Sequence, residues 1–141
     1  MFKTITALTL TLILFVGMVI PTSAVVPETV LPRWSYVLNF YINEFVIDPD
    51  TGIAECGAGL DTRQYLPGKI VCELQRYVGG LWATIKSWEA TGSMGADVYG
   101  CYAVYSGYRY RVKATGYVYS SSGALLETVT ATTPEQYYSG N

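Results

Sequence analysis

The stretch that decides the fold is residues 108–114, Tyr-Arg-Tyr-Arg-Val-Lys-Ala, in which uncharged and positively charged residues alternate. Successive side chains of an extended strand point to opposite faces of a sheet. The stretch therefore predicts a strand that buries its Tyr, Val and Ala side chains and leaves its Arg and Lys side chains in water. A helix would need apolar residues three and four positions apart instead.

Six further segments share this composition, rich in Tyr, Val, Ile and Thr and bounded by Gly, Pro, Asp or Ser. Residues 70–77 are expected to pair with residues 108–114. Gly79-Gly80 predicts a tight hairpin, because glycine reaches the positive φ angles of a two-residue turn. A slip of the alternation at Asn43-Glu44 predicts an irregularity in the first strand. The expected strands are residues 35–47, 53–60, 70–77, 81–88, 98–104, 108–114 and 125–131.

Seven short antiparallel strands predict an all-β fold, a two-sheet sandwich that follows an N-terminal signal helix. The sandwich domain is expected to span residues 34–131. Residues 25–33 are expected to form an extended leader, because Pro27 and Pro32 withhold backbone donors. Residues 132–141 are predicted to form a polar C-terminal tail.

The N-terminus has the three parts of a secretory signal peptide: Lys3, an uncharged run over residues 7–20, and the small residues Thr22-Ser23-Ala24. The run is shorter than the roughly 20 residues that a membrane-spanning helix needs. We therefore expect residues 1–24 to be removed after Ala24. The mature protein is predicted to be secreted and extracellular, with no membrane attachment after cleavage.

The charge balance argues against polyanionic partners. The chain has 9 Lys and Arg against 11 Asp and Glu, and cleavage of the signal peptide would remove Lys3 as well. A protein with this balance has no broad positive field to attract phosphate or anionic lipid. We therefore expect no nucleic-acid partner.

Four segments together resemble small secreted proteins of Gram-positive bacteria that form a family of domains of unknown function. They are residues 74–77 (Leu-Gln-Arg-Tyr), 79–82 (Gly-Gly-Leu-Trp), 85–88 (Ile-Lys-Ser-Trp) and 107–113 (Gly-Tyr-Arg-Tyr-Arg-Val-Lys). The resemblance covers residues 32–131 and implies no particular chemistry.

The segment that starts at Tyr108 also resembles the tyrosine corner of immunoglobulin-like and fibronectin type III sandwiches. There a tyrosine hydroxyl bonds to a backbone group a few residues upstream. The resemblance implies that Tyr108 takes this role and that the architecture is immunoglobulin/fibronectin type III-like. Tyr110 stands where antibody domains have their second bridging cysteine, which marks a departure from that family.

The chain has no histidine, so serine or cysteine hydrolysis with a histidine base is excluded. Paired carboxylates could still act as acid and base, as in glycoside cleavage. Their spacing selects no pair, and carboxylates on outward strand faces commonly keep sheet edges soluble. The candidates are Glu44, Glu55, Asp61, Glu73 and Glu89.

Residues 48–52, Asp-Pro-Asp-Thr-Gly, followed by Glu55, faintly resemble an oxygen-ligand calcium loop. The segment lacks the third ligand and the length of the full motif. The same residue types make a hairpin turn, which is the favoured interpretation. No metal or other cofactor is expected.

Three cysteines occur, and a secreted location permits a disulfide. Strand parity predicts that Cys56 and Cys72 point into the core and that Cys101 points outward. A Cys56–Cys72 disulfide is therefore expected, with Cys101 unpaired. It requires the two strands to be neighbours or the sheets to pinch together, because packed sheets stand about 10 Å apart and bridged Cα atoms are usually less than about 7 Å apart.

Trp82 and Trp88 are six residues apart, which predicts that they share one face of their strand and could stack on sugar rings. The alternative, which we favour, is that they fill the core or the ordinary surface of a small sandwich. The predicted function is a secreted, non-enzymatic binding or interaction module for a cell-wall glycan or a protein. The alternative is a secreted carboxylate-dependent hydrolase of unknown substrate.

Overall fold

A computed structural model describes residues 33–141 of the chain. The predicted signal peptide, residues 1–24, and all but the last residue of the predicted leader lie outside the described residues. Within the described range no helix is long and apolar enough to span a membrane.

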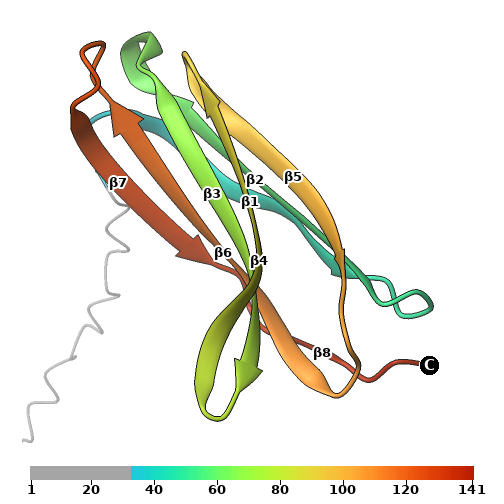
Figure 1. The fold of residues 1–141 in the computed structure, drawn as a ribbon. Coiled ribbons are helices and arrows are strands. Elements are labelled where there is room, and N and C mark those ends of the chain that lie inside the picture. Colours follow the sequence, from blue (N-terminus) through green and yellow to red (C-terminus); the bar gives the residue numbers. More distant parts are fainter. Residues whose placement is uncertain (1–32) are drawn as a thin grey trace, which may run out of the picture. The chain divides into compact units, whose positions relative to one another are not determined.

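Two antiparallel sheets face each other (Figure 1). The first has the order β1-β2-β5 and the second the order β4-β3-β6-β7, with β8 pairing beside β6. A short 3₁₀ turn, η1 (Arg63–Tyr65), follows β2. The strands are β1 (Val37–Ile47), β2 (Ile53–Thr62), β3 (Gly68–Val78), β4 (Leu81–Gly92), β5 (Gly95–Ala103), β6 (Tyr108–Tyr119), β7 (Leu125–Thr132) and β8 (Gln136–Tyr138).

The strand order confirms the predicted antiparallel sandwich. With the first seven strands lettered A to G, the sheets are A-B-E and D-C-F-G. An immunoglobulin constant domain instead groups A-B-E-D against C-F-G. The fourth strand here belongs to the other sheet, because the Gly79-Gly80 hairpin pairs it with β3.

Both predicted turns are present. Gly79 and Gly80 have φ angles of 59° and 83°, which only glycine adopts without strain. At the other turn, an Asp48 side-chain oxygen accepts the backbone N–H groups of Asp50 and Thr51 at 2.8 and 3.1 Å. These bonds stabilise the turn that leads into Gly52, whose φ is 68°.

The predicted irregularity in the first strand is a β-bulge. Ile42 lies opposite Ala58 and Glu44 lies opposite Gly57, so Asn43 is the extra residue. A bulge also occurs in β4 at Ile85.

The core lies between the sheets and consists of the inward-facing side chains of both. Even-numbered residues of β2, β3 and β6 supply most of it, as the alternation of residues 108–114 predicts. Glu127 adds a polar link between the sheets, since its carboxylate on β7 accepts the backbone N–H groups of Tyr36 and Val37 at the start of β1. The buried apolar residues are Val37, Ala54, Cys56, Ala58, Leu60, Ile70, Cys72, Leu74, Val98, Tyr110, Val112, Ala114, Val118 and Val129.

The predicted polar tail is partly structured. Its residues 136–138 form β8, which pairs with the first residues of β6. Together β7 and β8 form an interrupted row along one side of β6. Thr133 lies in the interruption and bonds to both the N–H and the C=O group of Val112, while Pro134 has no N–H group to continue the pairing.

Candidate binding surface

The prediction that Trp82 and Trp88 share one face of their strand is wrong. Gln75 lies opposite Thr84, but Leu74 lies opposite Lys86, so Ile85 is an extra residue on β4. A bulge of one residue reverses the faces on its two sides. The two tryptophans therefore lie on opposite faces of the sheet.

Trp88 faces inward. It lies opposite the buried Cys72 and packs against the core. Its indole ring covers Gly100 of the facing sheet, where a Cβ atom would lie 2.2 Å from the ring. The core-filling interpretation therefore holds for Trp88.

Trp82 faces outward, where it joins a layer of stacked side chains on β4, β3 and β6. The Arg111 guanidinium lies 4.3 Å from the centre of the Trp82 ring, and the Tyr77 ring centre lies 5.2 Å from that of Trp82. The Arg109 guanidinium lies 4.1 Å from the Tyr77 ring centre. We call Arg111, Trp82, Tyr77 and Arg109 the aromatic–arginine layer. Cation–ring contacts of this kind contribute about 0.5–1 kcal/mol each at exposed sites.

The two arginines of this layer are held by further polar contacts. A Glu135 side-chain oxygen lies 2.9 Å from the Arg109 guanidinium, and this hydrogen bond raises the pKa of Arg109. The Arg111 side chain donates to the Gln75 side-chain oxygen at 2.8 Å. Both guanidinium groups are therefore fixed over their rings.

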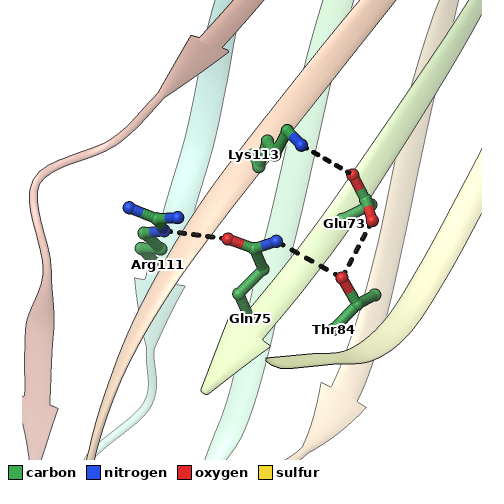
Figure 2. A network of polar contacts seen from close by, with 5 residues as sticks. All are labelled: Glu73, Gln75, Thr84, Arg111 and Lys113. Carbon is green, nitrogen blue, oxygen red and sulfur yellow. Dashed lines mark hydrogen bonds and ion pairs between the residues drawn. The ribbon is translucent and has the colours of Figure 1, made fainter. Parts of the chain in front are cut away.

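The Gln75 contact belongs to a chain of bonds that crosses three strands (Figure 2). Gln75 donates to the Thr84 hydroxyl at 3.3 Å, and this hydroxyl donates to Glu73 at 2.8 Å. A Glu73 oxygen lies 4.0 Å from the Lys113 amino group. The network thus orders the outward side chains of β4, β3 and β6 before any partner binds.

The layer is bordered by exposed apolar and aromatic groups. Tyr137 of β8 lies opposite Arg109, so it shares the outward face, and its side chain is 64% exposed. Leu81, at the tip of the β3–β4 hairpin, is 73% exposed. Tyr, Trp and Arg are the residue types most enriched among those that contribute most to protein–protein binding.

The tyrosine corner is present, but Tyr110 makes it rather than Tyr108. The Tyr110 hydroxyl donates to the backbone oxygen of Tyr105 at 2.5 Å, and Tyr110 is fully buried. Tyr108 is partly exposed, and its ring lies 4.6 Å from the Arg76 guanidinium and 6.5 Å from the Tyr110 ring. Both tyrosines have the same parity, so alternation alone could not choose between them.

The predicted parities of the cysteines are confirmed, but the predicted disulfide is not. Cys56 and Cys72 are buried, Cys101 is exposed, and all three are free thiols. Cys56 is on β2 and Cys72 is on β3, which lie in opposite sheets, at a backbone separation that a disulfide does not normally span. Burial raises the pKa of Cys56 to about 12 and that of Cys72 to about 11.

The carboxylates proposed for hydrolysis are spread over both sheets. Glu73 belongs to the network described above, and Glu89 pairs with Lys69 at 3.0 Å. Asp61 accepts the Asn39 side-chain amide at 3.1 Å.

The structure brings some acidic groups together that the sequence did not pair. Burial raises the pKa of Tyr41. Asp97, which accepts a hydrogen bond from the Tyr41 hydroxyl at 3.2 Å, and Asp61 raise this pKa further. The hydrogen bond between Tyr99 and Cys101 raises the pKa of Tyr99, and Glu55 and Glu44 lie close enough to add to this rise. These groups lie along the solvent-facing side of the three-stranded sheet, whereas catalytic carboxylates normally line a concave site.

Comparison with models of protein families gave no match to the chain, and comparison with curated proteins gave no relative. The resemblance to small secreted proteins of Gram-positive bacteria therefore stays a prediction. Function has to be inferred from the geometry of the surface itself.

Proposed function

We propose that the protein is a secreted, non-enzymatic binding module that recognises an extracellular protein through the outward face of β4, β3 and β6. The observation that carries the proposal is the aromatic–arginine layer, Arg111–Trp82–Tyr77–Arg109, stacked in a fixed order on a solvent-facing sheet. A surface that is ordered before binding loses less conformational entropy when a partner arrives.

A protein partner fits this layer better than a glycan. A sugar platform needs a flat ring face free for stacking, but Arg111 lies over the Trp82 ring. The Tyr77 and Trp82 rings are also inclined by 56°, so they form no common plane. Aromatic rings beside fixed guanidinium groups instead offer apolar contact area together with donors for carboxylates and backbone carbonyls.

Site-specific photo-crosslinking tests the proposal. A benzoylphenylalanine replaces Tyr137 beside the layer or, as a matched control, Tyr99 on the opposite sheet, which is 59% exposed. Each protein is incubated with surface and secreted proteins of the producing cells. We expect a discrete crosslinked product from position 137 that Trp82→Ala and Arg111→Ala both remove and that position 99 does not give.

Three results would contradict the proposal. They are equal crosslinking from both positions, no effect of either substitution in variants that still melt cooperatively, and Trp82-dependent binding to purified peptidoglycan in place of a protein. The last result would assign the surface to a glycan.

A further inference from the structure

A second site lies on the inward side of the same sheet, where the two sheets separate near the end of β5. It is a cavity of about 440 Å³, within the range of about 300–1,000 Å³ that small-molecule sites occupy. Strands β3, β4, β5 and β6 and the connection after β5 all contribute to its wall. The lining residues are Arg76, Ile85, Tyr102, Ala103, Val104, Tyr105 and Tyr110.

Arg76 places a positive charge in the wall of this cavity. Its guanidinium stacks on the Tyr108 ring at 4.6 Å. Burial raises the pKa of the Tyr110 hydroxyl, and the charge of Arg76 and its hydrogen bond with this hydroxyl offset part of the rise. The Arg76 Nε atom is buried and has no hydrogen-bond partner among the described residues. A buried donor of this kind is rare in folded proteins and costs free energy until an acceptor reaches it.

The bulge in β4 adds a second cation beside the cavity. It turns Lys86 to the inward side, opposite the buried Leu74. The Lys86 amino group lies 5.9 Å from the ring of Tyr102, which lines the cavity. The three ion pairs within residues 33–141 involve neither Arg76 nor Lys86. In the described part of the protein, two cations therefore lie here and neither is paired with a carboxylate.

The other residues that line the cavity determine which kind of ligand fits beside the two cations. Ile85, Val104 and the tyrosine rings offer apolar and aromatic contact area. The Tyr110 hydroxyl already donates to the Tyr105 carbonyl, so it is committed as a donor. One planar guanidinium matches the two oxygens of a carboxylate, whereas a phosphate dianion is usually met by several donors or charges.

We propose that this cavity binds a small carboxylate with an aromatic or branched apolar body. The carboxylate meets Arg76, with Lys86 adding attraction at the rim, and the body lies against Ile85 and Val104. The site is separate from the outward layer of the proposed function and does not depend on it.

Benzoate and its uncharged analogue benzamide test this site in the purified protein. The methyl NMR signals of Ile85 and Val104 report occupancy. We expect saturable shifts with benzoate and at least about tenfold weaker binding of benzamide, since a hydrogen bond from a guanidinium is stronger to a charged carboxylate than to a neutral amide. Arg76→Gln should weaken benzoate binding by about tenfold or more, and Arg76→Lys by less. The control Lys69→Gln removes a cation paired elsewhere, with Glu89, and should leave benzoate binding unchanged.

The comparison of benzoate with benzamide on the unmodified protein keeps the test decisive if Arg76→Gln does not fold. Equal binding of the two compounds, or no saturable shift at Ile85 and Val104, overturns the proposal. Tighter binding of inorganic phosphate at the same methyl groups overturns the assignment to a carboxylate.

Discussion

The hydroxyl of Tyr110 donates a hydrogen bond to the backbone oxygen of Tyr105, five residues upstream, at 2.5 Å. This bond joins the connection that follows β5 to the third residue of β6. Among residues 33–141, Tyr110 is also the largest fully buried side chain. The β5–β6 connection between the two sheets is thus held by one side chain that contributes both core volume and a polar anchor.

Replacing Tyr110 with Phe should lower the free energy of unfolding by about 1–3 kcal/mol, because the Tyr105 carbonyl loses its donor while the ring is kept. Urea unfolding followed by fluorescence measures the change. The matched variant Tyr108→Phe should cost less than about 0.5 kcal/mol, since the ring of Tyr108 makes its contacts. An equal loss of unfolding free energy in the two variants would show that the Tyr110 hydroxyl does not make the tyrosine corner.

Gly95→Ala should be much more destabilising than Gly107→Ala, although both glycines have positive φ angles, 105° and 89°. Both substitutions cost about 1–2 kcal/mol for that backbone conformation. At Gly95 the new Cβ would also lie 2.0 Å from the backbone oxygen of Leu60, whereas at Gly107 nothing lies within 4 Å. Thermal melting of the two variants compares them directly, and similar melting temperatures would contradict the close strand approach at Gly95.

Cys101 should react with a thiol reagent in the native protein, while Cys56 and Cys72 should react only after unfolding. Burial keeps the two core thiols away from the reagent and raises their pKa values, and the thiolate is the reactive form. Spectrophotometric titration should count one thiol in buffer and all three in denaturant. A count of one thiol in denaturant without reductant would show that the core cysteines are bridged.

The free energy of unfolding should fall as pH rises from about 9 towards about 12. The folded pKa values of Cys56 and Cys72, about 12 and about 11, lie above the ordinary value of 9.0. The unfolded chain therefore loses these protons first, and stability that is fully present below pH 9 is lost as pH rises, by about 1 kcal/mol per pH unit for each thiol. Urea unfolding with reductant at several alkaline pH values measures the slope.

The variant that carries Cys56→Ala and Cys72→Ala provides the control for this slope. It removes both thiols, so its stability should fall less steeply over the same range. An identical slope in the variant would attribute the alkaline loss to other groups, such as the tyrosines.

The sequence was sufficient for the sandwich, because alternation, turn residues and strand lengths depend on local preferences. The bulge at Asn43 was visible in the same way, since apolar residues change from even to odd positions there. The bulge at Ile85 left a similar signal, an apolar residue at an odd position between Trp82 and Trp88. The six-residue spacing of the tryptophans predicts a shared face only for an unbroken strand, and the bulge at Ile85 breaks that strand between them.

The other differences depend on the tertiary arrangement. Parity predicted that Cys56 and Cys72 are both buried, but parity does not say which sheet a strand joins. Residues 136–138 have no alternation of their own and become a strand because β6 extends beyond the end of β7. The aromatic–arginine layer needs β4, β3 and β6 side by side, so its four members could not be grouped from one segment.

The interruptions of β1, β4 and the β7–β8 row also protect the protein against aggregation. All three are edge strands, and a regular edge exposes unpaired backbone groups to which a strand of another molecule can add. Bulges at Asn43 and Ile85 and the proline at position 134 break the regular spacing that such an addition requires. A formal net charge of only −2 supplies little repulsion between copies. The irregular edges hinder strand addition at β1, β4 and the β7–β8 row, whereas the fourth edge, β5, pairs with β2 in an unbroken register.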